Sequence, residues 1–523
     1  MLIHKEKKAV LLRLKNPSRV TSVIPTAIVI NHKGSPIVAV PHRPDETKVL
    51  RNLGFDVDAP MPVHYDWPKV GGRYDPFEAQ RETASFLSMQ RRAFCLNGMG
   101  TGKTNSALWA FDYLKRTKGV NKMLVVCPLS TMERTWADSI FQTFPNMDAV
   151  VLHGTRERRN KLLKQDVDIY IINIDGIATI SESLAKRPDI DLIVVDELAL
   201  ARNQSTDRWK ILNTICNKQG TRRVWGMTGS PTPNAPTDAW AQCKLVTPDN
   251  PMVPKYFGAF RDSVMRQLTP FKWVVRDKAN DVVYNMMQPA IRYSLDDCVD
   301  LPEQTFLYRD VPLTPEQAKA YKDMLSKLAA EYQGGQIMAV NEAVKANKLI
   351  QIACGVAYGT NGEEIEIPSK PRMDLLKEVI EESEGKVIVF VPLTGALESV
   401  ASELSKVCTV ETVHGRTSKS DRDRIFGEFQ KQADPRVLVA NASTMSHGLT
   451  LTAATTIVWY APVHSNEVYE QACARVRRPG QTRTTVIVHI SGTEIERRVY
   501  KRLQEKQSMQ GLLLEMMKER IEP

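Results

Sequence analysis

Cysteine pairs, long apolar runs and repetitive tracts are missing from this chain of 523 residues. Its eight cysteines include no Cys-x-x-Cys pair, and Cys127 lies inside an apolar run, a pattern typical of reduced, buried thiols that argues against a disulfide framework or a zinc site. No apolar run approaches the length of a membrane span, and the first residues lack the apolar core of a signal peptide. We therefore expect a soluble, cytoplasmic protein with no membrane contact.

The composition is that of a globular protein, with 42% hydrophobic and 25% charged residues. The length predicts about three to four domains. The formal net charge of +10 favours a polyanionic partner, because clustered Lys and Arg displace the counterions condensed on a phosphate backbone. A generic basic enzyme explains the charge alone equally well.

The first 68 residues predict a small β-rich accessory domain that carries several Lys and Arg residues. Residues 20–30 and 36–40 read as strands on either side of a turn at 31–35, and residues 45–52 as a short helix that ends at Gly54. Pro60, Pro62 and Pro68 predict a stiff connection to the next domain. This domain is a candidate DNA-binding module, and a packing module without DNA contact is equally consistent with the sequence.

From residue 71 onward, short apolar runs alternate with helical stretches in two separate blocks, which predicts two α/β domains with buried parallel sheets. We expect domains at 69–290 and 370–492, a partly helical linker at 291–369 and a C-terminal helix at 493–523. Thr314 with Gln317, and Thr493 with Glu496, predict capping boxes at two helix starts. The expected strands are 93–96, 122–127, 168–174, 191–195 and 223–227 in the first block, and 386–391, 407–413, 436–440, 456–460 and 485–490 in the second.

A glycine-rich loop lies between the predicted strand at 93–96 and a predicted helix at 105–114, as a phosphate-binding loop requires. Glycines allow the backbone amides to approach a phosphate closely, and the helix N-terminus adds a positive dipole. Lys103 is expected to pair with the β- and γ-phosphates of ATP, and the Thr104 hydroxyl to ligate Mg²⁺. Asn97 stands where the general pattern has its first glycine, and the remaining loop residues are Gly98, Met99, Gly100, Thr101 and Gly102.

Two adjacent carboxylates follow the apolar run that begins at Asp191, and ligands bind at this end of strands in open α/β sheets. Asp196 is expected to hold Mg²⁺ through water, and Glu197 to polarise the attacking water. A solvated turn is the alternative for such a pair. Its position about ninety residues after the phosphate-binding loop favours the catalytic interpretation.

Gln471, Arg475 and Arg478 are spaced i, i+4 and i+7, which predicts one shared helical face that ends at Pro479 and Gly480. Arginines on such a face can act as fingers on the γ-phosphate. Taken alone, the segment favours a solvated basic helix face. The phosphate-binding loop and the carboxylate pair, at the expected separation along the chain, favour the finger interpretation instead.

Together these motifs resemble superfamily 2 helicases, specifically the Swi/Snf-like group, from about residue 71 to 503. Residues 99–104 resemble motif I, 196–199 the Asp-Glu-x-His box, 228–234 motif III, and 471–481 motif VI. The box has Ala199 where the family has His, which affects any coupling role of that side chain and leaves hydrolysis intact. Residues 76–80 resemble the upstream segment, which implies that Gln80 reads the adenine edge.

The resemblance implies two tandem RecA-like parallel-sheet domains with helical insertions, ATP and Mg²⁺ as cofactors, and Arg475 and Arg478 completing the ATP site of the first domain. It also implies contacts with the nucleic-acid backbone at motif Ia and at segments of the second half. The residues expected to make these contacts are Pro128, Ser130, Thr131, His414, Gly415, Ser443 and Thr444.

We therefore expect a monomeric DNA-dependent ATPase that translocates on, unwinds or branch-migrates duplex or branched DNA in replication, recombination or repair. The compact chain and the pattern at Asn203 and Ser205 resemble bacteriophage members, which places it in the host cytoplasm. An RNA helicase, a restriction-type translocase subunit and a remodelling protein with a degenerate ATPase are the alternatives. The intact Lys103, Asp196 and Glu197 disfavour the last of these.

Overall fold

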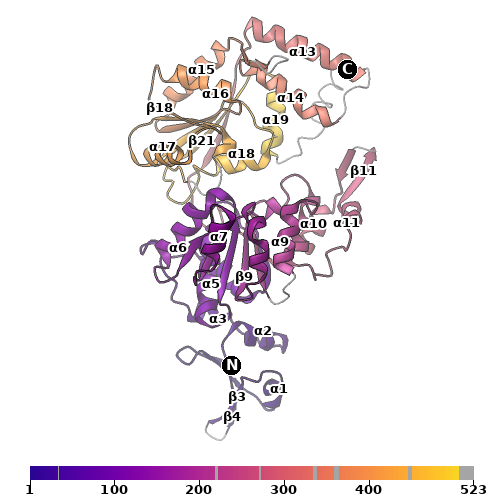
Figure 1. The fold of residues 1–523 in the computed structure, drawn as a ribbon, viewed down its shortest axis with the longest axis vertical. Helices are drawn as coiled ribbons and strands as arrows, with labels where there is room; N and C mark the ends of the chain where they lie inside the picture. Colours follow the sequence, from indigo (N-terminus) through magenta and orange to yellow (C-terminus); the bar gives the residue numbers. More distant parts are fainter. Residues whose placement is uncertain are drawn as a thin grey trace. The chain divides into compact units, whose positions relative to one another are not determined.

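A computed structural model describes residues 1–32, 35–217, 222–269, 272–333, 339–358, 364–445 and 450–505 of the chain (Figure 1). It forms two compact units. The first comprises Met1–Thr232, Pro236–Gln267 and Trp273–Val299, and the second comprises Asp300–Pro523 with the short stretches Pro233–Ala235 and Leu268–Lys272. Among the described residues, no helix is both long enough and apolar enough to cross a membrane.

The N-terminal part of the first unit is an antiparallel sheet in the order β1-β2-β4-β3. Every second residue of its inner strands, among them Val10, Leu12, Val38 and Val40, packs into a small apolar core. The β-rich N-terminal domain is thereby confirmed. Its elements are β1 (Leu2–His4), β2 (Ala9–Arg13), α1 (Ser18–Thr21), β3 (Ile28–His32), β4 (Ser35–Pro41), α2 (Pro44–Asn52) and α3 (Pro60–His64).

One local prediction in this domain is wrong. Residues 20–30 are not one strand, because α1 ends at Thr21 and β3 begins only at Ile28. Pro25 lies between them and has no N–H to give to a sheet ladder, so the chain turns there. The proline-rich connection contains α3, whose first residue is Pro60, the helical position that a proline tolerates.

The core of the first unit is a seven-stranded sheet in the order β13-β5-β10-β9-β6-β8-β7, and all its pairs are parallel. Along β6, Leu124 and Val126 belong to one apolar cluster and Met123 and Val125 to another, so helices cover both faces. The five predicted strands are confirmed. The strands are β5 (Arg92–Cys95), β6 (Lys122–Cys127), β7 (Ala149–Val151), β8 (Ile169–Asn173), β9 (Ile190–Asp196), β10 (Arg223–Met227) and β13 (Ala290–Ile291).

The helices of the first unit surround this sheet, as Figure 1 shows for α5, α7 and α9. They are α4 (Glu78–Met89), α5 (Lys103–Arg116), α6 (Asp138–Thr143), α7 (Arg156–Leu163), α8 (Ser181–Ala185), α9 (Asp207–Asn217), α10 (Ala239–Val246), α11 (Phe257–Val264) and α12 (Ala279–Met286). A separate two-stranded sheet pairs β11 (Met265–Thr269) with β12 (Lys272–Val275).

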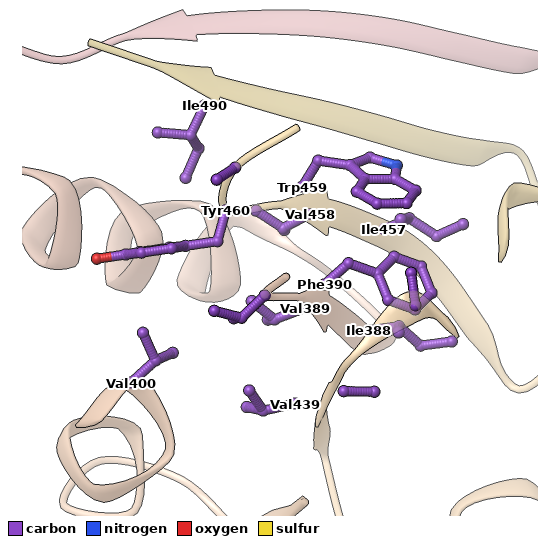
Figure 2. Packing of buried hydrophobic residues seen from close by; sticks show 14 of the residues in the cluster. Ile388, Val389, Phe390, Val400, Val439, Ile457, Val458, Trp459, Tyr460 and Ile490 are labelled. Atoms are coloured by element: carbon purple, nitrogen blue, oxygen red, sulfur yellow. The ribbon is translucent and has the colours of Figure 1, made fainter. Parts of the chain in front are cut away.

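The second unit contains a six-stranded parallel sheet in the order β14-β21-β20-β17-β19-β18. Figure 2 shows how Phe390, Val439, Ile457 and Trp459 pack on it, and the Phe390 and Trp459 ring centroids lie 4.7 Å apart. A second α/β domain is thereby confirmed. The strands are β14 (Gln304–Asp310), β17 (Lys386–Phe390), β18 (Val410–Val413), β19 (Val437–Ala440), β20 (Ala454–Trp459) and β21 (Thr485–Ser491).

The helices of this unit include the one expected after Thr314. That capping box is confirmed, because Gln317 N donates to Thr314 Oγ1 (3.2 Å) and Thr314 N to Gln317 Oε1 (3.1 Å). The helices are α13 (Pro315–Gln333), α14 (Ala339–Ala353), α15 (Lys370–Glu382), α16 (Thr394–Leu404), α17 (Lys419–Lys431), α18 (Asn466–Cys473) and α19 (Glu494–Gln504), and β15 (Val356–Tyr358) pairs with β16 (Glu364–Glu366).

Two boundaries differ from expectation, and a third lies partly outside the described residues. The strand predicted at 407–413 begins at Val410, because the amides of Val407 and Cys408 both bond to the Leu404 carbonyl at the end of α16. The segment expected to be a linker at 291–369 is divided between the units, since β13 reaches Ile291 in the first sheet and β14 is an edge strand of the second. Of the expected C-terminal helix, residues 506–523 lie outside the described part.

The capping box predicted at Thr493 does not form, because the Thr493 side chain accepts no hydrogen bond and Glu496 takes the Gly492 amide in place of the Thr493 amide. Glu496 accepts hydrogen bonds from the Gly492 amide (2.9 Å) and from the Thr493 hydroxyl (2.8 Å), so Thr493 donates where a capping box needs it to accept. Glu496 is fully buried and pairs with the buried Arg372 at 2.8 Å, which gives this carboxylate a tertiary role.

Candidate active site

The predicted phosphate-binding loop joins the end of β5 to the start of α5. Lys103, the first residue of α5, donates from Nζ to the carbonyls of Asn97 (2.9 Å) and Gly98 (3.0 Å). Gly100 and Gly102 have φ of 80° and 81°, the left-handed region that favours glycine. A strand, a loop with two such glycines and a helix N-terminus therefore stand in the order that the sequence predicts.

Asn97 braces this loop from both sides, a role that the sequence did not reveal. Its Nδ2 donates to Thr83 Oγ1 on α4 (2.8 Å), and its Oδ1 accepts from the Tyr293 amide beyond β13 (3.0 Å). The Gly98 amide in turn donates to the Tyr293 carbonyl (2.8 Å). The sequence did contain one indication of this role, since Asn97 stands where the general pattern has glycine. A buried Asn needs hydrogen-bond partners for both its donor and its acceptor.

Gln80 on α4 supports the same loop from beneath. Its Oε1 accepts from the Phe77 amide (3.1 Å), and its Nε2 donates to the Thr101 carbonyl (3.0 Å). A Cβ at Gly102 would overlap Gln80 Nε2, and the φ of 81° at this residue independently favours glycine. The structure thus brings Gln80 to the loop, and adenine recognition by Gln80 stays a prediction.

The predicted carboxylate pair lies at the carboxyl end of β9. Asp196 Oδ2 accepts a hydrogen bond from the indole Nε1 of Trp136 (2.9 Å), and Oδ1 accepts from the Glu197 amide (3.0 Å). Glu197 has φ 54° and ψ 51°, a left-handed conformation that is strained for a side-chain-bearing residue. Strand, indole and turn together fix where both carboxylates lie, whereas Ala199 is buried in the following turn.

Motif III follows β10, the strand between β5 and β9. The Thr228 amide donates to the Cys95 carbonyl (3.1 Å) at the end of β5, and a Cβ at Gly229 would touch Met99 of the loop at 3.5 Å. The phosphate-binding loop, motif III and the carboxylates therefore lie at the carboxyl ends of three neighbouring parallel strands.

The predicted backbone-contacting segment of the first unit follows β6. The Pro128 carbonyl accepts from both the amide (3.1 Å) and the hydroxyl (3.0 Å) of Thr131, which is buried, whereas Leu129 and Ser130 are exposed. A π-helical stretch at Met132–Ala137 comes directly after this turn and carries Trp136. Irregular helices of this kind often mark functional segments. The hydrogen bond from Trp136 to Asp196 could not be predicted from the sequence, because spacing along the chain does not show which acceptor a buried Trp reaches.

In the second unit the structure brings the two other predicted contact segments together. His414 and Gly415 follow β18, and Ser443 and Thr444 follow the neighbouring β19. The Thr444 hydroxyl reaches the Val413 carbonyl at 3.3 Å, which ties the two turns to each other. Ser443 and Gly415 are exposed, and residues 446–449, which follow directly in the chain, lie outside the described part.

The shared helical face predicted for Gln471, Arg475 and Arg478 is wrong. α18 ends at Cys473, and residues 474–480 form turns. Pro479 has no N–H for the Arg475 carbonyl, which a helix would require, and that carbonyl instead accepts from the Leu451 amide (2.9 Å). Arg478 Nε donates to the Ala474 carbonyl (2.9 Å), the acceptor that its own amide would use in a helix.

Gln481 stabilises this turn by hydrogen bonds, a role that the sequence did not reveal. Its buried Nε2 donates to the carbonyls of Ala454 (2.9 Å), Thr452 (3.1 Å) and Val476 (3.2 Å), and its Oε1 accepts from the two following amides. The turn carries Arg475, which is buried, and Arg478, whose Nη1 lies 3.3 Å from Thr450 Oγ1. Burial lowers the pKa of Arg478 to about 10, so the guanidinium keeps its charge at neutral pH.

The groups at the carboxyl edge of the first sheet fit a nucleoside triphosphate with a magnesium ion. Two glycines in the left-handed region shape the loop, and the first-turn amides of α5 have no acceptor within their own helix. Lys103 and Thr104 supply a cation and a hydroxyl, and Asp196 supplies a carboxylate oxygen, the ligand type that Mg²⁺ prefers.

Comparisons with known proteins agree with this geometry. Residues 82–354 match the SNF2-related domain, and residues 371–480 match the helicase conserved C-terminal domain. Protein p41 of Acyrthosiphon pisum secondary endosymbiont phage 1 is 24% identical over 80% of this chain and 94% of its own length. The SWI/SNF-related matrix-associated actin-dependent regulator of chromatin subfamily A-like protein 1 of Xenopus laevis is 23% identical over 80% of this chain.

The Xenopus protein is matched over only 42% of its length, so this chain spans less than half of that relative. A solved structure of the Sulfolobus solfataricus SWI2/SNF2 ATPase core in complex with dsDNA is 21% identical, covers 83% of this chain and 91% of its own, and has a TM-score of 0.38. The SNF2-related domain alone spans more than half of the chain, and its phosphate-binding loop, carboxylates and motif III meet at one sheet edge. The chain belongs to the Swi/Snf-like group of superfamily 2 helicases and is an ATP-hydrolysing enzyme of that group.

Proposed function

We propose that this enzyme is a DNA-dependent ATPase that moves on duplex or branched DNA and migrates forks or junctions in replication, recombination or repair. The observation that carries the proposal is the hydrogen bond from Trp136 to Asp196 (2.9 Å). It joins the segment that is expected to contact nucleic acid to a carboxylate of the ATP site.

The link spans only a few residues of the chain. Leu129 and Ser130 lie exposed in the turn after β6, and the π-helical stretch begins at Met132. Trp136 is fully buried in that stretch, so a displacement of the exposed turn acts directly on the indole and on the Asp196 oxygen that it holds. A nucleic-acid backbone at Ser130 is thereby coupled to the geometry of the hydrolytic carboxylates.

Each residue of the ATP site has a defined task in this proposal. Lys103, now bonded to two loop carbonyls, exchanges them for the β- and γ-phosphates. Thr104, and Asp196 through water, would hold Mg²⁺, which would neutralise charge on the phosphates. Glu197 orients and polarises the attacking water. The adenine edge is assigned to Gln80.

In the second unit, the turns with Gly415 and Ser443 supply the other nucleic-acid contacts, since both are exposed and lie on neighbouring strands. Arg475 and Arg478 are assigned to stabilising charge on the γ-phosphate, as the resemblance to motif VI implies. Alternate grip on the phosphates of one strand by the two units then produces stepping. The phage relative p41 fits a host-cytoplasmic, phage-encoded motor.

The test measures ATP turnover without nucleic acid and with single-stranded DNA, blunt duplex, forked DNA, a four-way junction and RNA, together with the DNA products. We expect the largest stimulation with duplex or branched DNA, and product formation with forks and four-way junctions. Stimulation by RNA alone would overturn the substrate assignment. Turnover that no nucleic acid changes would overturn the proposed function.

A further inference from the structure

A groove with a volume of about 590 Å³ lies in the first unit, between the N-terminal sheet and the C-terminal end of α5. Its walls come from the β1–β2 turn, the end of β4 and the residues that follow α5, and its floor includes His42 and His64. We propose that this groove is a second binding site for the phosphate backbone of duplex DNA. The inference rests on the proposed function and extends it to the N-terminal domain, which precedes the SNF2-related domain at residues 82–354. Only the wall formed by the end of α5 and the residues after it belongs to that family domain.

Charge is the first argument. Residues 1–43 contain eight Lys or Arg residues and one carboxylate, Glu6, so they carry a net charge of +7 out of +10 for the whole chain. The remaining residues are nearly neutral. Residues 44–68 of the same domain carry a net charge of −3, so the positive charge that attracts a polyanion is concentrated in the first 43 residues.

The arrangement of the cations is the second argument. Lys7, Lys8, Arg43 and Lys118 line the groove with exposed side chains, and none of them has a carboxylate partner in the described part of the chain. Arg116 in the same groove differs, because it pairs with Asp112 (2.7 Å) and with Asp66 (2.9 Å). Glu6 also lines the groove, but the cations outnumber this carboxylate and leave an excess of positive charge for phosphates.

Two histidines on the floor of the groove are held in place by hydrogen bonds and lie close to these positive charges. His42 Nε2 donates to the Asp58 carbonyl (2.8 Å), because a carbonyl only accepts, and its Nδ1 then accepts from His64 Nε2 (2.9 Å). Burial lowers the pKa of His64 to about 4, and the charges of His42, Lys8 and Lys5 act in the same direction. Both rings are therefore neutral at pH 7 and act as a polar floor beneath the cations.

The groove also lies at a useful distance from the ATP site. α5 begins at Lys103 in the phosphate-binding loop, and its far end, at Arg116, lines the groove. A helix of this length spans about 20 Å, roughly six base pairs of duplex. DNA held in the groove is thus close to the motor without touching the loop, as an arm of a branched substrate would be. Contacts to the backbone alone predict binding without sequence preference.

The test compares two pairs of substitutions that remove the same charge from the same small domain. Lys7→Gln/Arg43→Gln alters the groove, and Arg13→Gln/Lys15→Gln removes two exposed cations that do not line it. Binding of fluorescent duplex DNA to the full chain is measured by anisotropy across salt concentrations, with ATP turnover in the absence of DNA as the control for folding.

We expect the groove pair to lower the slope of log K against log salt by about 2, since each lost phosphate contact lowers it by about 0.9, and to weaken binding several-fold. The matched pair should change the slope by less than half of that amount, and turnover without DNA should be unaffected in both. Equal losses in the two pairs, or no loss in either, would overturn the site.

Two further outcomes separate the site from the proposed function. If DNA stimulates turnover of the unaltered chain and the groove pair binds DNA normally, the groove proposal fails and the motor stands. If DNA does not stimulate turnover, the proposed function fails, and the binding slopes still decide the groove. Capture of anionic lipid vesicles, rather than DNA, through Lys7 and Arg43 would assign the groove to a membrane surface and overturn the proposal.

Discussion

Lys103 in the first unit and Arg372 in the second are both cations held by several hydrogen bonds, but their partners differ. Lys103 bonds to two uncharged carbonyls, whereas Arg372 is fully buried against the carboxylate of Glu496. Arg478 resembles Lys103, because it bonds to the Ala474 carbonyl and the Thr450 hydroxyl. Among the described residues, neither Lys103 nor Arg478 has a carboxylate partner.

The partners decide what each cation can do. The Glu496 carboxylate compensates the charge of Arg372, so this charge stabilises the fold and does not attract a ligand. Carbonyl and hydroxyl groups satisfy donors and leave the charge uncompensated, which keeps Lys103 and Arg478 ready for an anion. Burial without a counter-charge has a cost, which is visible in the lowered pKa of Arg478. Variants at these positions test the distinction.

The largest effect is expected for the structural cation. Arg372→Met leaves the buried Glu496 without its ion-pair partner and should lower the free energy of unfolding by about 3–5 kcal/mol. Chemical denaturation measures this loss. The double variant Arg372→Met/Glu496→Leu should recover most of the stability, and a double variant as unstable as the single one would contradict the ion-pair explanation.

Lys103→Ala should reduce ATP turnover by about a hundredfold or more, because it removes the cation assigned to the phosphates. The free energy of unfolding should fall by only about 1 kcal/mol, since two hydrogen bonds to carbonyls are lost. Steady-state turnover with saturating DNA gives the first quantity and denaturation the second. Lys210→Ala, an exposed lysine on α9, is the control and should leave both unchanged.

Arg478→Met should separate function from stability most clearly. Turnover should fall by about a hundredfold, while the free energy of unfolding is unchanged or rises by about 1 kcal/mol. The sign follows from the pKa: the folded value of about 10 lies below the unfolded one, so the charged form opposes folding below pH 10, and the penalty disappears as the pH rises further. A marked loss of stability in this variant would show that Arg478, like Arg372, is a structural cation.

The smallest of these effects is expected at Trp136. Trp136→Phe keeps an aromatic ring and removes the N–H that bonds Asp196, so DNA-stimulated turnover should fall about tenfold, with a raised Mg²⁺ requirement. Trp109→Phe is the matched control, because its buried indole donates to the Pro68 carbonyl (2.9 Å) in the same unit. If both variants lose turnover equally and at unchanged Mg²⁺ dependence, Trp136 is only a packing residue.

Much of the fold follows from local sequence signals. The buried strands of both sheets were predicted because their apolar runs are nearly continuous, as parallel strands covered on both faces require. The helix after Thr314 was predicted because its capping box is made by residues three apart. The errors occur where a proline or a distant partner intervenes, as at residues 20–30 and at the turn after Cys473.

The candidate site divides in the same way. The strand, loop and helix around Lys103 and the position of Asp196 at a strand end follow from chain order alone. The brace by Asn97, the turn held by Gln481 and the indole at Asp196 do not, because each joins residues far apart in the sequence.

The sequence by itself therefore determined that this chain has two α/β domains and a phosphate-binding loop whose lysine opens a helix. Only the tertiary structure decided which cations have a carboxylate counter-charge. Lys103 and Arg478 meet carbonyls and Arg372 meets Glu496, and the spacing of these residues does not distinguish the two cases. The physical reason is that a buried cation takes its hydrogen-bond partners from whatever the fold brings within about 3 Å.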